Sequence, residues 1–221
     1  MAARKQVTGE MVLSAARDLI EQDGAAAFSL RVLAGRLGIS SPSLQWHVGS
    51  KEQLLVDVVD SVLAEVQLPA HEDHGAYDWL CQAALAIRDH LARRAAFVPL
   101  LRDLASFAPS TVDLEYEIAV GLVRAGLKGR DLALAHVSYV AFVFGYTFLR
   151  SSIADAARVA GAPELMERVD VRRREGLDAR PNLSAAFAGM PADDDPDEMF
   201  ASGVAALLRG FGVRRPARRT G

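Results

Sequence analysis

The side chains best suited to contact another molecule lie close together, between residues 29 and 51. Two short apolar segments meet there at Gly38, and the second segment shows only small, polar or flat side chains at its remaining positions. Hydroxyl, amide and imidazole groups of this kind form hydrogen bonds with another surface. No nucleophile elbow, phosphate loop or metal-binding helix motif occurs in the chain. The indicated chemistry is recognition.

This pattern is typical of a helix-turn-helix, in which one helix braces a second that enters the major groove of DNA. Apolar residues at helical spacing predict the first helix within 29–38. Ser41 is expected to cap the second helix, with Pro42 at the first helical position. That helix has only about seven residues, fewer than an isolated helix needs, so packing of Leu44 and Val48 must hold it.

An amphipathic helix is predicted on each side of this motif. The earlier helix begins after Thr8, a good N-cap, and ends at Gly24. The later one opens with a capping-box pattern from Ser50 to Gln53 and keeps an apolar face as far as Val66.

The remainder of the chain also shows helical periodicity, so we expect an all-α protein. Residues 1–51 would form a helix-turn-helix DNA-binding domain and residues 52–221 a helical ligand-binding and dimerisation domain. The stretch 158–197, rich in Gly, Pro, Arg and Asp, is predicted to be partly disordered. Further helices are expected near 76–94, 97–107, 110–126, 131–157 and 196–210.

The charge is unevenly distributed along the 221 residues, of which 51% are hydrophobic and 24% charged. Residues 1–51 hold six Lys or Arg and four Asp or Glu, a net charge of +2. Because the whole chain carries −3, the remainder carries −5. A basic end on an acidic body orients the molecule toward phosphate without making it bind every nucleic acid.

The sequence predicts a cytoplasmic protein without a membrane span. Its single cysteine suits a reducing compartment, and its first residues lack the apolar region of a secretion signal. The longest apolar candidate, Val137 to Leu149, is interrupted by polar residues and is too short to cross a bilayer.

Two pairs of residues that include histidine offer other chemistry. His71 and His74 have the spacing of metal ligands but lie in a predicted turn without a further ligand nearby, so a structural role is favoured and no metal or cofactor is expected. His136 and Tyr139 share a helix face with aromatic residues, which favours a core or pocket lining over acid–base catalysis.

The segment from Leu37 to Lys51 resembles, without a gap, the DNA-binding domain of the tetracycline-repressor (TetR) family. Its Pro-x-Leu-x-Trp-His-Val part is similar to the tetracycline repressors themselves. The resemblance implies that the groove-facing positions are Arg31, Ser41, Pro42, Ser43, Gln45, Trp46 and His47, with Lys51 on a phosphate.

These assignments agree with the chemistry of DNA. Arg31 can fork to guanine O6 and N7, Gln45 can pair with adenine, and Pro42 can meet a thymine methyl group. Ser43, His47 and Lys51 can reach backbone oxygens. Leu30 and Gln45 depart from the hydroxyl residue and tyrosine of the tetracycline repressors, so the operator sequence cannot be transferred.

Simpler roles remain open for three of these side chains. Arg31 could be a plain surface charge, and His47 an exposed polar residue without a contact. Trp46 could serve as the hydrophobic plug beneath the second helix, since aromatic side chains gain much from burial.

The resemblance further implies a homodimeric, ligand-responsive repressor that binds a palindromic operator. The alternative is an all-helical enzyme or lipid-handling protein with an N-terminal bundle that does not bind DNA. In the family, the last long helices of two subunits form a four-helix bundle. Here 131–157 and 196–210 would take that role, through Phe144, Phe148, Val204, Leu207 and Leu208.

The effector is expected to be a small, largely apolar molecule held in the core of residues 52–157. The helix that starts near Lys51 would act as the lever between this core and DNA. Gln67 stands at the family's metal-coordinating position, which disfavours magnesium–tetracycline, and a solid core without a cavity is the simpler alternative. The predicted lining is Val62, Val66, Phe97, Leu101, Leu104, Tyr139 and Phe142.

Overall fold

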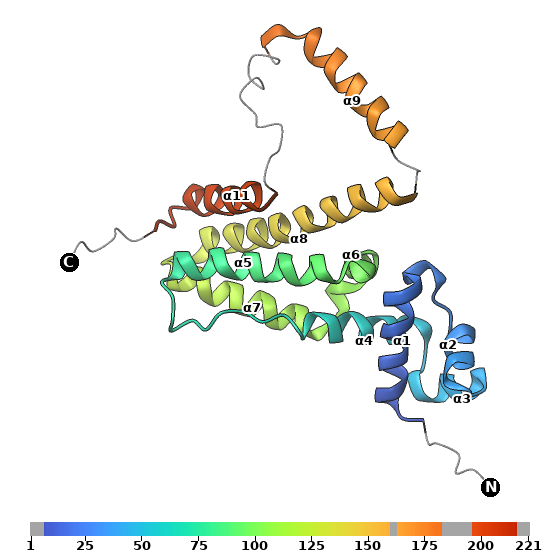
Figure 1. The fold of residues 1–221 in the computed structure, drawn as a ribbon. Coiled ribbons are helices and arrows are strands. Elements are labelled where there is room, and N and C mark those ends of the chain that lie inside the picture. The colour runs from blue at the N-terminus through green and yellow to red at the C-terminus, as the bar shows by residue number, and fades with distance from the viewer. Residues whose placement is uncertain (1–6, 160–162, 183–195, 216–221) are drawn as a thin grey trace.

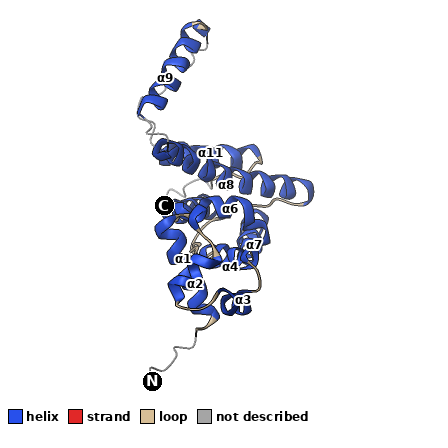
Figure 2. Ribbon diagram, turned by 90° about the vertical axis from the view of Figure 1, so that its right-hand side faces the viewer, coloured by secondary structure: helices blue, strands red, loops and turns tan. Residues whose placement is uncertain are grey.

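The computed structural model describes residues 7–159, 163–182 and 196–215, and their regular structure is entirely helical (Figure 2). Three short 3₁₀ turns, at Ala25–Ala27, Ala95–Phe97 and Ala105–Phe107, connect some of the helices. The α-helices are α1 Gly9–Asp23, α2 Leu30–Leu37, α3 Ser41–Val48, α4 Lys51–Leu63, α5 Ala76–Arg93, α6 Val98–Leu104, α7 Pro109–Arg124, α8 Gly129–Val159, α9 Pro163–Asp178 and α11 Pro196–Gly210.

Helices α1, α2 and α3 form the N-terminal unit, with boundaries set by side-chain caps and glycines. Thr8 Oγ accepts a hydrogen bond from the N–H of Met11, and Ser29 Oγ accepts one from Val32, both at 3.2 Å. Gly38 ends α2 with a φ of 69°, in the left-handed region that favours glycine. The predicted limits of α1 and α2 are confirmed.

The predicted cap of α3 is wrong by one residue. Ser40 is the N-cap, because its backbone is extended and its Oγ accepts the N–H of Ser43 at 3.3 Å. Ser41 is therefore already helical, and Pro42 takes the second helical position, where its missing N–H is also harmless.

Helix α4 leads from the N-terminal unit into the helical body, which α4–α8 and α11 form together (Figure 1). Ser50 Oγ accepts the N–H of Gln53 at 3.0 Å, but the Gln53 amide donates to Asp57 instead of returning to the cap. Only half of the predicted capping box forms. The helix ends at Leu63 rather than Val66, although Val66 stays buried in the segment that follows.

Trp79 of α5 lies at the centre of the body. It is fully buried, and its indole N–H donates to the carbonyl of Pro69 at 2.8 Å. A Cβ added at Gly121 of α7 would come within 2.7 Å of the Trp79 ring, so only glycine lets the two helices approach this closely. Helix α7 also packs against α4, so this part of the core supports α4.

Helix α9 contradicts part of the disorder predicted for 158–197. Residues 163–178 form a helix that extends away from the body (Figure 1), while 160–162 and 183–195 lie outside the described residues. Its sequence has no apolar stripe, so periodicity could not reveal it. Residues such as Arg172, Arg174 and Glu175 nevertheless have good helix propensity.

Helix α8 carries an apolar outer face. An 18-residue window within Gly129–Ser151 has a mean hydropathy of 1.7 and is only 22% buried, so by length and composition alone this stretch could cross a membrane. It is longer than the predicted apolar run from Val137 to Leu149. Those two side chains are 66% and 61% exposed.

The residues predicted to face a second subunit divide into two groups. Val204 and Leu208 of α11 are buried inside their own subunit, which contradicts their assignment to the outer face. Phe144, Phe148 and Leu207 are half-buried. The outward apolar surface is therefore carried mainly by α8.

Candidate nucleic-acid interface

Helix α3 is anchored by two side chains and offers the rest to solvent. Leu44 is fully buried and Val48 is 9% exposed, which confirms that these two hold the helix. The predicted contact residues on this helix are all exposed: Ser41, Pro42, Ser43, Gln45, Trp46 and His47. A short helix with this one-sided exposure is shaped to enter a groove.

Trp46 is not the plug beneath α3. Its side chain is 88% exposed, and its ring meets that of His47 edge-on with 6.1 Å between centroids. Leu44 fills the interior position instead, because it lies on the face toward α1 and α2. An indole so exposed gains little from the fold, which leaves it available for an external contact.

Two exposed cations flank α3. Arg31 lies in the first turn of α2, and Lys51 begins α4, with its Nζ 5.9 Å from the centroid of the buried Phe28 ring. Neither cation forms an ion pair with another described residue, whereas Arg17 and Arg36 of the same unit are bound to Glu65 and Gln22. The first-turn N–H groups of α4 lie beside Lys51, an arrangement suited to a phosphate.

Comparison with known proteins agrees with this geometry. The sequence pattern of the bacterial regulatory proteins of the tetR family matches residues 12–58. The tetracycline repressor protein class D of Escherichia coli is 38% identical over 213 residues, which cover 94% of this chain and 90% of the repressor. The chain belongs to the tetR family. Regulators of this family are DNA-binding proteins and are generally not enzymes.

Solved structures share the fold. The Streptomyces coelicolor TetR-family protein ActR in complex with actinorhodin is 22% identical and has a TM-score of 0.74, over 95% of this chain and all of that one. BioQ with its natural double-stranded DNA operator is also 22% identical, with a TM-score of 0.61 over 66% of this chain and 89% of that one.

The seven predicted effector-binding residues lie on or beside α4, α6 and α8. Val62, Phe97 and Leu101 are buried near α4 and α6, and Leu104 is half-buried there. Tyr139 donates its hydroxyl hydrogen to the Leu80 carbonyl at 2.6 Å, and burial raises its pKa strongly.

Phe142, the seventh predicted lining residue, faces α11. Its ring stacks on Phe200 with 5.6 Å between centroids and lies against Gly203. Of the seven residues, only Val66 lines the surface pocket of about 340 Å³ between the end of α4 and α7. That pocket also contacts Leu63, Leu68 and Leu114, and its polar lining includes Asp113 and Glu117.

The histidines considered for other chemistry have structural partners. The ring nitrogens of His71 lie 2.9 Å from Glu117 Oε2 and 2.7 Å from Arg124 Nη1, and the ring stacks on Trp79. His136 Nε2 lies 3.0 Å from the Glu115 carbonyl. Among the described residues, no group of three or more His, Cys, Asp or Glu side chains could hold a metal ion.

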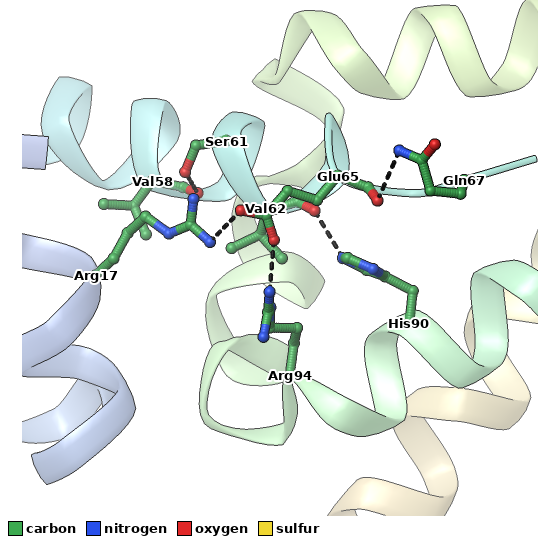
Figure 3. A network of polar contacts seen from close by, with 8 residues as sticks. All are labelled: Arg17, Val58, Ser61, Val62, Glu65, Gln67, His90 and Arg94. Atoms are coloured by element: carbon green, nitrogen blue, oxygen red, sulfur yellow. Dashed lines mark hydrogen bonds and ion pairs between the residues drawn. The ribbon is translucent and has the colours of Figure 1, made fainter. Parts of the chain in front are cut away.

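One polar cluster was missed by the sequence analysis. Glu65, just after α4, binds both Arg17 of α1 and Arg94 at the end of α5 (Figure 3). These partners are 48 and 29 positions away along the chain, so no local pattern pointed to them.

Proposed function

We propose that this protein binds a palindromic operator as a homodimer, represses transcription there, and is released by a small, largely apolar molecule. The observation that carries the proposal is the exposed face of α3, where Trp46 is 88% exposed while Leu44 and Val48 anchor the helix. An enzyme or lipid-handling protein has no use for such a surface. As a transcription regulator, the protein would act in the cytoplasm.

The proposed contacts follow from where the side chains lie. Arg31 and Gln45 read base edges, and Pro42 meets a thymine methyl group. Lys51 and the N-terminus of α4 hold phosphates. Ser41, Ser43, Trp46 and His47 complete the surface of α3. We retain residues 1–51 as the DNA-binding domain and 52–221 as the domain that binds effector and partner.

Dimerisation would cover the outer face of α8. One recognition helix touches too few base pairs for specificity, and two-fold symmetry doubles the contacts. The exposed Val137 and Leu149 supply the apolar area that a second subunit would bury.

The effector would bind in the helical body and act through α4. The operator complex of BioQ and the actinorhodin complex of ActR support, by analogy, separate sites for DNA and for effector. The likeness to the tetracycline repressors does not extend to magnesium–tetracycline, because Gln67 is exposed, offers an amide in place of imidazole, and bonds to the Glu65 carbonyl at 3.4 Å.

The proposal is tested by selecting duplexes from a random pool with the purified protein, followed by footprinting. We expect a near-palindrome whose half-sites lie about one helical turn, ~34–36 Å, apart. A pool without enrichment at any position would overturn it.

Two variants then separate base reading from phosphate binding on the selected duplex. Arg31→Ala should weaken binding by ~1–3 kcal/mol and relax the preference at one base pair. Lys51→Ala should weaken binding to all duplexes and lower the salt slope by about one ion. Identical behaviour of both variants would refute the assigned roles.

A further inference from the structure

Glu65 joins three helices that are distant in sequence. Its Oε1 accepts a hydrogen bond from Arg17 Nη2 of α1 at 2.5 Å, and its Oε2 accepts one from Arg94 Nη2 at the end of α5 at 2.6 Å (Figure 3). Both carboxylate oxygens are therefore used, each by a different part of the molecule. We call Arg17, Glu65 and Arg94 the carboxylate clasp.

The carboxylate clasp is partly shielded from solvent. The three side chains are 24–37% exposed, so water reaches them only in part. The Nε of Arg94 is buried and has no hydrogen-bond partner among the described residues, so this guanidinium depends on Glu65. Beside it, His90 of α5 donates its Nε2–H to the Val62 carbonyl at 2.8 Å, which ties α4 to α5.

The carboxylate clasp lies between the N-terminal unit and the helical body. Arg17 belongs to the N-terminal unit, whereas Arg94 and His90 belong to the body. A second contact, from the Ser110 N–H to Asp60 Oδ1 at 2.7 Å, fastens the same end of α4 to α7. Among the described residues, no other ion pair or side-chain hydrogen bond connects α1 to the body.

We propose that Glu65 is a positioning residue for operator recognition, because its carboxylate fixes the orientation of α1, α2 and α3 relative to the helical body. This inference rests on the proposed DNA-binding function. In a dimer, two recognition helices must fit one duplex at a set separation. A unit that is free to pivot loses more conformational freedom on binding and therefore binds more weakly.

The first experiment uses the duplex selected by the wild-type dimer. Glu65→Gln preserves the shape of the side chain and removes its charge. We expect its operator affinity to fall about fivefold or more, the lower range of energetic coupling between distant sites. The salt slope should stay unchanged, because Glu65 contacts no phosphate. Asp103→Asn is the matched control, since it removes an exposed carboxylate whose only ion-pair partner among the described residues is its neighbour Arg102.

The second experiment measures orientation directly and needs no DNA. A spin label on Asp23→Cys, at the exposed end of α1 in a Cys81→Ser background, reports the distance between the two N-terminal units by pulsed electron paramagnetic resonance. Glu65→Gln should broaden this distance distribution, whereas Asp103→Asn should not. Arg17→Gln should have the same effect as Glu65→Gln, and the double variant should add little to either.

The outcomes separate this inference from the proposed function. If the wild type selects no duplex, the proposed function fails and the inference falls with it. If the wild type binds its duplex but Glu65→Gln binds equally well, or if the distance distribution does not change, Glu65 is not a positioning residue.

Discussion

Trp46 is the side chain that supports the proposed binding surface most directly. Most large aromatic residues gain stability from burial, yet this one is 88% exposed beside a fully buried Leu44. The two residues lie on one short helix: Leu44 stabilises the fold, and Trp46 is available for an external contact.

Replacing these two residues should therefore have opposite consequences. Trp46→Ala should change the free energy of unfolding by no more than about 0.5 kcal/mol, as is usual for surface substitutions, and should weaken operator binding. Leu44→Ala should destabilise the protein by about 2–5 kcal/mol through the cavity that it leaves. Urea denaturation followed by circular dichroism measures both, and a strongly destabilised Trp46→Ala protein would contradict this division.

Glu65 should also give the stability a pH dependence. Burial raises the pKa of Glu65, but hydrogen bonds from Arg94 and Arg17 and their positive charges outweigh it, so the pKa lies below the ordinary 4.5. A carboxyl whose pKa is lowered by folding stabilises the folded state above its unfolded pKa, and this contribution is lost as the pH falls through the folded pKa.

The advantage of the wild type over Glu65→Gln in the free energy of unfolding should accordingly be full above about pH 4.5 and vanish below the folded pKa. Urea denaturation across this range measures it. A difference that grew on acidification would show that the clasp does not act through the charged carboxylate.

At the scale of the helices, the sequence predicted most of the architecture, because caps, glycines and apolar spacing are local signals. The helix limits at Thr8, Gly24, Ser29 and Gly38 follow from such signals. The errors have local causes too. Consecutive serines obscured the cap of α3, and α9 lacks an apolar stripe.

The candidate DNA surface was predictable because its residues lie within one short segment. The relation between Glu65 and its two arginines was not predictable, since it depends on how α1 and α5 pack against the end of α4. The predicted effector lining was taken from helix faces alone, and packing placed the Phe142 ring against Phe200 of α11.

The cap of α3 can be verified by comparing its adjacent serines. Ser40→Ala should destabilise the protein by about 1 kcal/mol, because the Ser43 N–H loses its acceptor. Ser41→Ala should have little effect, since alanine is well tolerated inside a helix. Thermal unfolding in the absence of DNA measures this difference. A larger destabilisation by Ser41→Ala than by Ser40→Ala would show that Ser41 is the cap.

For the whole molecule, the decisive surface is the outer face of α8. Val137→Asp places a charge where a second subunit is expected, and desolvating that charge should favour monomers. Val32→Asp introduces the same change on a partly exposed valine of α2, far from this surface, and should leave the dimer intact. Sedimentation at micromolar concentration distinguishes the two. A dimeric Val137→Asp protein would place the subunit contact elsewhere.

The apolar outer face of α8 would make the stability of the protein depend on its concentration in the cell. If a second copy covers the outer face of α8, subunit folding and association are linked by mass action, and stability rises with concentration. Newly made chains at low abundance would then be the most vulnerable to unfolding and proteolysis. A threshold in gene dosage would follow, below which the operator stays unoccupied whatever the effector does.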